Sequence, residues 1–313
     1  MRPPVQPADL SRVKTIPAEK RPILVRAGGF GKPTPPGASF RRFYEDLPDF
    51  LGAKSLKAAA RAIAAAWKGD RLVGAALGAH VIKVGLSPVV IDLMRRGILG
   101  CVSLHGAGAI HDAEVALFGE TSEDVAAGLD DGSFGMSEET AEFFRKALKG
   151  GCPDGLGRAL GKALLKQKAP NARLSILAQG ARLGIPVTVH VAFGTDIVHM
   201  HPGIDAAALG EATMLDFRIL AGALASLEGG VWMNVGSAVI LPEVFLKALN
   251  VARNLGSRVR DFTALDLDMQ RHYRPARNVL ERPGGKAFAL TGHHEITLPL
   301  LRMAVFEEAK RLG

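Results

Sequence analysis

The residues best suited to chemistry lie at positions 102–120, VSLHGAGAIHDAEVALFGE. The apolar start of this stretch predicts a buried strand, and the residues after the glycines predict a helix whose first turn carries His111 and Asp112. Gly106 and Gly108 lack a Cβ atom, so backbone amides can approach a ligand closely there. Since a helix N-terminus carries partial positive charge, the stretch suits an anionic group such as a dinucleotide phosphate. The alternative is a strand-to-helix turn that needs small residues only for packing.

Histidines recur where strands are expected to end. Of the nine histidines, His190 is expected in the middle of a strand and His272 away from a strand end. The other seven sit at or just beyond an expected carboxyl end: His80, His105, His111, His199, His201, His293 and His294. Ligands of open α/β sheets bind outside those ends, so we expect a site where His80, His293 and Asp196 converge. Taken singly, each imidazole could instead bond to the backbone.

One cluster has the composition of a metal site. His199 and His201 lie close to Asp196, and imidazole and carboxylate are suitable ligands. In an extended segment, however, the two histidines would point to opposite sides, and no HExxH spacing occurs. We therefore expect no metal, while a metal-dependent hydrolase using His and Asp stays open as an alternative.

The elements that must position these residues alternate along the chain. Strands are expected at 72–77, from 102, at 185–193, at 231–235 and at 287–290. Helices are expected at 54–68, 87–96, after Thr121, at 138–148, 175–183, 216–227, from about 241, and at the C-terminus. The repeated order of strand, glycine or polar tip, and helix predicts an α/β, Rossmann-like fold, with a mainly parallel central sheet and helices on both faces.

Length and composition set the organisation. The 313 residues are 48% hydrophobic, enough for one large core, which we place at 51–313. Residues 1–50 are rich in Pro, Gly and Arg, and we expect them to form an arm that wraps the domain or an oligomeric neighbour. The segment 150–157, GGCPDGLG, is expected to be a flexible connection.

Charge, cysteine content and missing motifs exclude several classes of function. The net charge of +8 is dispersed, which disfavours nucleic acid as a partner, and no stretch reads as a signal peptide or membrane span. Two cysteines favour a reducing cytoplasm over a disulfide framework, and Cys101 is expected to be a small buried apolar residue. The chain has no GxGxxG, Walker or GxSxG motif.

The order of five motifs resembles the deoxyhypusine synthase family over about residues 72–301. The motifs are LVGAALGAHVIKVGL, HGAGAIHDAEVAL, SILAQGARLGIPVTVHVAFGTD, NVGSAVILPEVFLKAL and HHEITLPLL. The resemblance implies a Rossmann-like fold and NAD bound at a subunit interface of a homotetramer. It also implies oxidation of a polyamine such as spermidine, followed by aminobutyl transfer to an acceptor amine.

The resemblance assigns roles to residues within those motifs. His111 and Asp112 match the family's HD pair, which implies polyamine contact or proton transfer. His293 stands where the family has an aspartate in its final motif. The cofactor-binding positions implied are Gly78, His80, Gly106, Gly108, Thr195, Asp196, Gly236, Ser237 and His294.

The chain lacks the catalytic lysine that the family carries in a WGK-type segment. The family's WGK segment is absent, and Asn278, Val279 and Leu280 stand near its position. Lys83, in the first motif, could be a relocated catalytic amine or a surface lysine. Two interpretations follow. The chain could be a divergent NAD-dependent transferase whose acceptor, a small amine or a protein lysine, has changed. Alternatively, it could be an inactive family member that binds a ligand or supports assembly.

Overall fold

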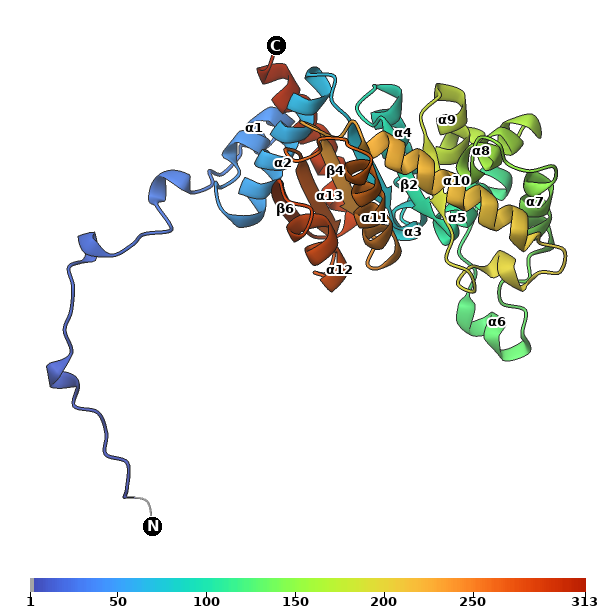
Figure 1. Cartoon of the computed structure of the whole chain (residues 1–313). Coiled ribbons are helices and arrows are strands. Elements are labelled where there is room, and N and C mark those ends of the chain that lie inside the picture. The colour runs from blue at the N-terminus through green and yellow to red at the C-terminus, as the bar shows by residue number, and fades with distance from the viewer. Residues whose placement is uncertain (1–2) are drawn as a thin grey trace. The chain divides into compact units, whose positions relative to one another are not determined.

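The computed structural model describes residues 3–313, which divide into two units at residues 50 and 51 (Figure 1). The first unit contains short turns of helix and one α-helix: η1 (Leu10–Arg12), η2 (Ala18–Lys20), η3 (Ala27–Gly29) and α1 (Phe40–Asp46). Within it, Asp46 accepts hydrogen bonds from Arg42 Nε at 2.7 Å and Thr34 Oγ1 at 3.1 Å. Most side chains before residue 40 are exposed, as expected for a segment that lacks a core of its own.

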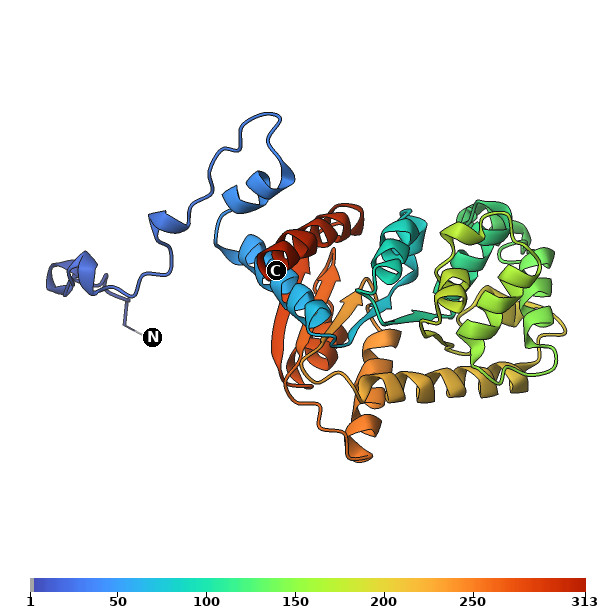
Figure 2. The same ribbon diagram turned by 90° about the horizontal axis from the view of Figure 1, so that it is seen from above.

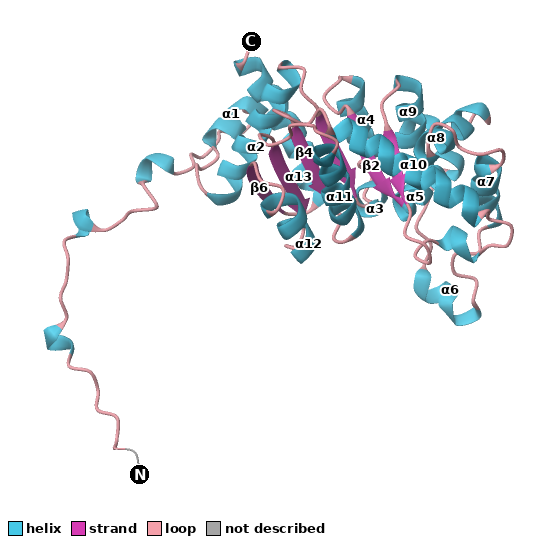
Figure 3. Cartoon of the chain, in the orientation of Figure 1, coloured by secondary structure: helices cyan, strands magenta, loops and turns pink. Residues whose placement is uncertain are grey.

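The second unit is built on one six-stranded, all-parallel sheet with helices on both faces, which confirms the predicted fold class (Figure 3). The strands are β1 (Val73–Leu77), β2 (Cys101–His105), β3 (Val187–His190), β4 (Val231–Val235), β5 (Thr263–Asp268) and β6 (Lys286–Thr291). Sequence reasoning missed β5 entirely. Asp266 and Asp268 obscured the alternating pattern they form with Leu265 and Leu267, although that alternation is itself a strand signal.

The strand order β3-β2-β1-β4-β5-β6 fixes where a ligand crevice can form. The chain moves outward from β1 to β3 and then returns to place β4 beside β1, with Leu77 paired to Val235 at the carboxyl ends. This order is that of a dinucleotide-binding Rossmann sheet, in which the crevice lies where the direction reverses. The switch point of this sheet is therefore between β1 and β4.

Helices cover both faces of the sheet (Figure 2). The α-helices are α2 (Leu51–Lys68), α3 (Ala79–Lys83), α4 (Ser87–Arg95), α5 (Gly106–Phe118), α6 (Val125–Asp131), α7 (Glu138–Leu148), α8 (Leu156–Lys166), α9 (Ile176–Leu183), α10 (Ala206–Leu224), α11 (Ile240–Asn254), α12 (Tyr273–Pro275) and α13 (His294–Arg311). Shorter turns are η4 (Ala172–Leu174), η5 (Ile197–Met200) and the π-helical η6 (Ala276–Glu281). Helices α2, α4 and α13 lie on one face, and α10 and α11 on the other.

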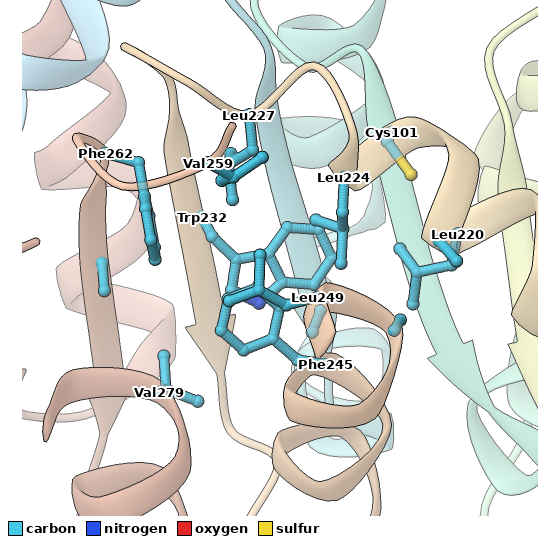
Figure 4. Close-up of a cluster of buried hydrophobic side chains, with 14 of the residues drawn as sticks. Cys101, Leu220, Leu224, Leu227, Trp232, Phe245, Leu249, Val259, Phe262 and Val279 are labelled. Atoms are coloured by element: carbon cyan, nitrogen blue, oxygen red, sulfur yellow. The ribbon is translucent and has the colours of Figure 1, made fainter. Parts of the chain in front are cut away.

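The core under α10 and α11 is centred on Trp232 (Figure 4). Its ring stacks on Phe245 with centroids 4.9 Å apart, and Phe262 meets Phe245 edge-on at 6.4 Å. Trp232 is paired with Gly74 across β1 and β4, and a Cβ on Gly74 would lie 2.6 Å from the indole ring. Cys101 is fully buried in the same cluster, and burial raises the pKa of its thiol to about 12, so it packs as a small apolar residue.

Several expected element boundaries are wrong. The segment expected to be a flexible connection leads directly into α8, and α10 begins ten residues before the expected position 216. Asp205 caps α10 by accepting a hydrogen bond from Ala208 N at 2.9 Å. The helix expected after Thr121 is capped by Asp124, which accepts from Ala126 N, and so leaves the Thr121 side chain free for another role.

The third strand is shorter than expected. It ends at His190, so this histidine lies at a strand end and not in the middle of a strand. Among residues 3–313, none of the helices combines the length and the apolar character needed to cross a bilayer.

Candidate functional site

The tips of β1 and β4 touch at the switch point. Gly78 N donates to Val235 O at 2.8 Å, and a Cβ on Gly78 would overlap the carbonyl oxygen of Gly236. Gly236 has φ +70°, a conformation that favours glycine, and a Cβ there would lie 2.6 Å from His294 Nε2. The ring of His80 lies 5.9 Å from that of His294. The structure thus brings together four of the expected cofactor-binding residues at the position where a dinucleotide crevice belongs.

Buried polar groups beside this point lack partners. Asn234 Nδ2 donates to Ser237 O at 3.0 Å and to Asp266 Oδ1 at 2.8 Å, and Ser237 Oγ accepts from Leu241 N at the start of α11. Asn234 Oδ1 and His294 Nδ1 are buried without a hydrogen-bond partner in the described part of the chain. Such groups typically cost about 1–3 kcal/mol each when unsatisfied, so polar groups of a ligand would be favourable here.

Two ionisable side chains at this edge have shifted pKa values. Burial raises the pKa of Asp266 and lowers that of His294. Both shifts are toward the uncharged form of the side chain. A neutral His294 has one donor and one acceptor nitrogen, which is the hydrogen-bonding capacity that a bound ligand would use.

Asp268, which the sequence analysis did not single out, lies at the end of a βαβ unit of the kind that binds one half of a dinucleotide. Strand β4, the Gly236 turn, α11 and β5 form a βαβ unit, and Asp268 ends its second strand. In dinucleotide-binding sheets an acidic residue at this point binds the ribose hydroxyls. Asp268 Oδ1 accepts from Met269 N at 2.7 Å, and its other carboxylate oxygen lies 3.9 Å from His272 Nε2.

A second hollow, of about 560 Å³, opens beside α5 and the tip of β3. Lys83 reaches it from α3, and Thr195 and Asp196 reach it from the segment after β3. The acidic residues in its lining are Glu114, Glu120, Glu123 and Asp196. Four carboxylates face one lysine, so this cavity, here called the acidic pocket, suits a cationic ligand. It adjoins the switch point through α3, which begins directly after Gly78.

His111 is held in the acidic pocket by a chain of hydrogen bonds. His111 Nδ1 lies 2.6 Å from Thr121 Oγ1, and Thr121 donates to Glu114 Oε2. Thr140 Oγ1 donates to the other carboxylate oxygen of Glu114 at 3.1 Å. Burial opposes ionisation of Glu114, but the hydrogen bonds from His111, Thr121 and Thr140 outweigh it and lower its pKa. A charged Glu114 therefore fixes a histidine whose Nε2 remains for proton transfer.

Asp112, the other half of the expected pair, is not in the acidic pocket. Its carboxylate is 1% exposed and accepts hydrogen bonds from Ser175 Oγ, Ile176 N and Leu177 N at 2.5, 2.7 and 3.1 Å. It therefore caps the N-terminus of α9. Neighbouring residues on a helix point about 100° apart, so His111 and Asp112 face different surroundings. Burial raises the pKa of Asp112 to about 6.

The expected phosphate position at the start of α5 is filled by the chain itself. A Cβ on Gly106 would overlap the carboxylate of Asp196, which accepts a hydrogen bond from Ala107 N. Gly108 packs against Leu104 instead of facing a ligand. A phosphate at this helix N-terminus would have to displace a carboxylate that is 6% exposed, so the expectation for Gly106 and Gly108 is not supported.

The remaining histidines divide into structural and exposed groups. His105 Nε2 accepts from Ala79 N at 3.3 Å, and burial, aided by His111, lowers the pKa of His105 to about 4. His190 bonds to Thr188 Oγ1 at 2.9 Å, and burial lowers its pKa to about 3. His293 is exposed, 3.8 Å from Glu295, and lies away from the buried position of His294.

The suspected metal cluster is incomplete, because His199 Nε2 lies 4.0 Å from Asp196 Oδ2 while His201 is directed elsewhere. His199 Nδ1 accepts from Gly194 N and Asp196 N, while His201 Nε2 bonds to Gly135 O at 2.8 Å in another loop. Across residues 3–313, no three His, Cys, Asp or Glu side chains are grouped so as to hold a metal ion. The geometry gives no support to a metal-dependent hydrolase.

Comparisons with known proteins show similarity at the level of the fold. No family model and no curated protein matches the chain. A structure from Methanococcus maripaludis S2, provisionally assigned as an LOR/SDH protein, matches with TM-score 0.52 and 14% identity, over 89% of this chain and 72% of that one. A provisionally assigned deoxyhypusine synthase from Entamoeba histolytica matches with TM-score 0.53 and 12% identity, over 88% and 96%.

A third similar structure contains a cofactor. AgrE, solved in a ternary complex with ornithine and NAD+, matches with TM-score 0.54 and 13% identity. The match covers 81% of this chain but only 33% of AgrE, so the chain spans about a third of that protein. At these identities the comparisons define a Rossmann-like α/β fold shared with these proteins.

Proposed function

We propose that the chain is an NAD-dependent enzyme that oxidises a cationic amine of the polyamine class and transfers part of it to an altered acceptor. The observation that carries this proposal is the acidic pocket, with four carboxylates in its lining, beside the glycine tips of a Rossmann switch point. The fold similarity to AgrE, a protein solved with NAD+ and ornithine, supports the same pairing of a dinucleotide with an amine.

The residues at the switch point fit a dinucleotide. Gly78 and Gly236 let the tips of β1 and β4 and the His294 ring pack closely together, Ser237 follows in the β4 turn, and Asp268 would bind ribose hydroxyls. The unpartnered Asn234 Oδ1 and His294 Nδ1 offer further polar contacts. When bound, NAD supplies a hydride acceptor.

In the acidic pocket, the chain's own residues would bind the substrate and move protons. Glu120 and Glu123 would hold ammonium groups of the polyamine. His111, oriented through Thr121 by Glu114, would take the proton of the reacting nitrogen, because an amine must be neutral for hydride to leave the adjoining carbon. Lys83 is the one amine in the pocket lining and remains the candidate nucleophile in place of the absent WGK lysine.

The test is calorimetric titration with spermidine in the presence of NAD, paired with an assay of NADH formation. We expect Glu120→Gln to weaken spermidine binding at least ten-fold and His111→Asn to abolish NADH formation while both variants stay folded. Glu139→Gln, on the exposed side of α7, is the matched control and should behave as wild type. Equal spermidine affinity in Glu120→Gln and Glu139→Gln would rule out the acidic pocket as the spermidine site.

The second candidate is a family member that binds these ligands without turnover. The absence of a WGK-type lysine favours it. Binding of NAD and spermidine with no NADH formed under any tested acceptor would establish this alternative.

A further inference from the structure

A third hollow, of about 950 Å³, lies at the opposite edge of the sheet, where β5 and β6 begin. It is formed by the loop between α11 and β5 and by the turn before β6. Three arginines line it, Arg253, Arg258 and Arg260, and its lining contains no acidic residue. We call it the arginine pocket.

Hydrogen bonds and the burial of Val259 position the three arginines around the hollow. Arg253 donates from Nε to Val259 O at 2.9 Å and from Nη2 to Pro283 O at 2.7 Å, so its guanidinium is fixed between the two loops. Val259 is fully buried, and in an extended segment its neighbours Arg258 and Arg260 point away from the core. All three cationic groups therefore lie around one hollow.

Glu228 is an acidic residue near these arginines, and its pKa is lowered first by the hydrogen bonds that it accepts from the backbone and then by the positive charges of Arg258 and Arg260. In the described part of the chain, no carboxylate lies within ion-pair distance of Arg253, Arg258 or Arg260. The nearby Glu228 accepts hydrogen bonds from the backbone N–H groups of Arg260 and Asp261, at 2.6 and 3.0 Å. The Glu228 carboxylate thus binds the loop backbone and forms no ion pair with the arginine side chains.

We propose that the arginine pocket binds a small molecule bearing a diphosphate group. Guanidinium groups bind phosphate oxygens in pairs of parallel hydrogen bonds, so Arg258 and Arg260 can each bind one of two linked phosphates. Arg253, whose Nε and Nη2 donate to carbonyl oxygens, adds positive charge to the same hollow. The hollow is concave, which suits a small ligand better than a flat bilayer surface. The site is separate from the switch point, at the other end of the strands, and does not depend on the proposed activity.

The test is titration of the full chain with inorganic pyrophosphate at low ionic strength. We expect saturable binding that weakens about ten-fold or more in the Arg258→Gln/Arg260→Gln variant, since charge-assisted hydrogen bonds are lost. Arg218→Gln, at an exposed arginine on α10, is the control that should leave the affinity within two-fold.

Two results would overturn the proposal. One is pyrophosphate affinity that is absent or unchanged in the double variant. The other is binding to vesicles containing phosphatidylglycerol, or to a DNA duplex, that requires Arg258 and Arg260 while pyrophosphate does not bind. Inorganic phosphate and NAD are titrated in parallel into the wild type and the Arg258→Gln/Arg260→Gln variant. Only the affinity that the double variant loses reports on the arginine pocket, and it distinguishes a free phosphate from the diphosphate of a nucleotide.

Discussion

At the scale of single residues, the acidic pocket depends on one face of α5. His111 and Glu114 lie on that face, one turn apart, while Asp112 points into the core. The sequence suggested that His111 and Asp112 act as a pair, but adjacency in sequence separates side chains on a helix. Glu114 is the residue that orients His111, and its spacing of three residues from His111 could have predicted that both lie on one face of the helix.

Replacing Asp112 tests its structural role. Asp112→Ala would leave the Ser175 hydroxyl and two buried N–H groups at the start of α9 without an acceptor. We expect a loss of about 3 kcal/mol in the free energy of unfolding, measured by urea denaturation. Asp124→Ala removes an exposed helix cap and should cost only about 1 kcal/mol. Loss of spermidine binding in a fully folded Asp112→Ala protein would contradict this role.

Asp216 makes stability depend on pH. It accepts hydrogen bonds from Val189 N and Gly157 N, and burial outweighs them and raises its pKa to about 7. The unfolded state ionises near pH 4, so the folded state binds more protons between pH 4 and 7. The contribution of Asp216 is therefore complete below pH 4 and is lost as the pH rises to about 7.

The measurement is thermal unfolding at pH 5 and pH 7.5. For Asp216→Asn, the change in stability between the two values should be smaller than for wild type by about 1–3 kcal/mol. Asp205→Asn, at the exposed cap of α10, should keep the wild-type pH dependence. Identical profiles for wild type and Asp216→Asn would show that Asp216 is ionised throughout.

At the scale of elements, the sequence predicted β4 and α7 correctly but missed β5, a strand that contains two aspartates. The bounds of β4 and α7 agree with the expected 231–235 and 138–148, because a short, mainly apolar run after glycines and a Ser-capped amphipathic helix are local signals. Strand β5 was missed because its aspartates are buried by neighbours far away in sequence. The contact of Asp196 with the start of α5 also joins distant segments, and no local pattern predicts it.

The pairing of β1 with β4 gives a prediction about packing. Gly74→Ala would place a methyl group against the Trp232 ring, so we expect a loss of about 2 kcal/mol in the free energy of unfolding. Gly222→Ala lies in α10 with open space around it, and should instead stabilise the protein by about 0.5–1 kcal/mol. Chemical denaturation of both variants measures the difference, and similar values would contradict the packing described for β1.

At the scale of the whole molecule, the first unit presents apolar side chains to solvent. Leu10 is 75% exposed and Leu24 is 92% exposed. Isolated exposed apolar residues are ordinary, but a series along one segment is typical of a surface that contacts another chain. We therefore predict that residues 3–50 contact another copy of the chain.

Light scattering tests this arrangement. We expect the wild-type chain to have about four times the 33.1 kDa mass of one subunit, and the Leu10→Ser/Leu24→Ser variant to have a smaller mass at equal concentration. The reason is that burial of these side chains would stabilise the assembly. A wild-type monomer would exclude a tetramer, and an unchanged mass in the variant would exclude Leu10 and Leu24 from the interface.

The most direct measurement is calorimetric titration of NAD into the wild-type protein and into Asp268→Ala. A dinucleotide at the switch point predicts saturable binding that weakens about ten-fold when the ribose-binding carboxylate is removed, and unchanged affinity in Glu139→Gln. If the wild-type protein binds no NAD, or if Asp268→Ala binds it with wild-type affinity, the switch point between β1 and β4 is not a dinucleotide site.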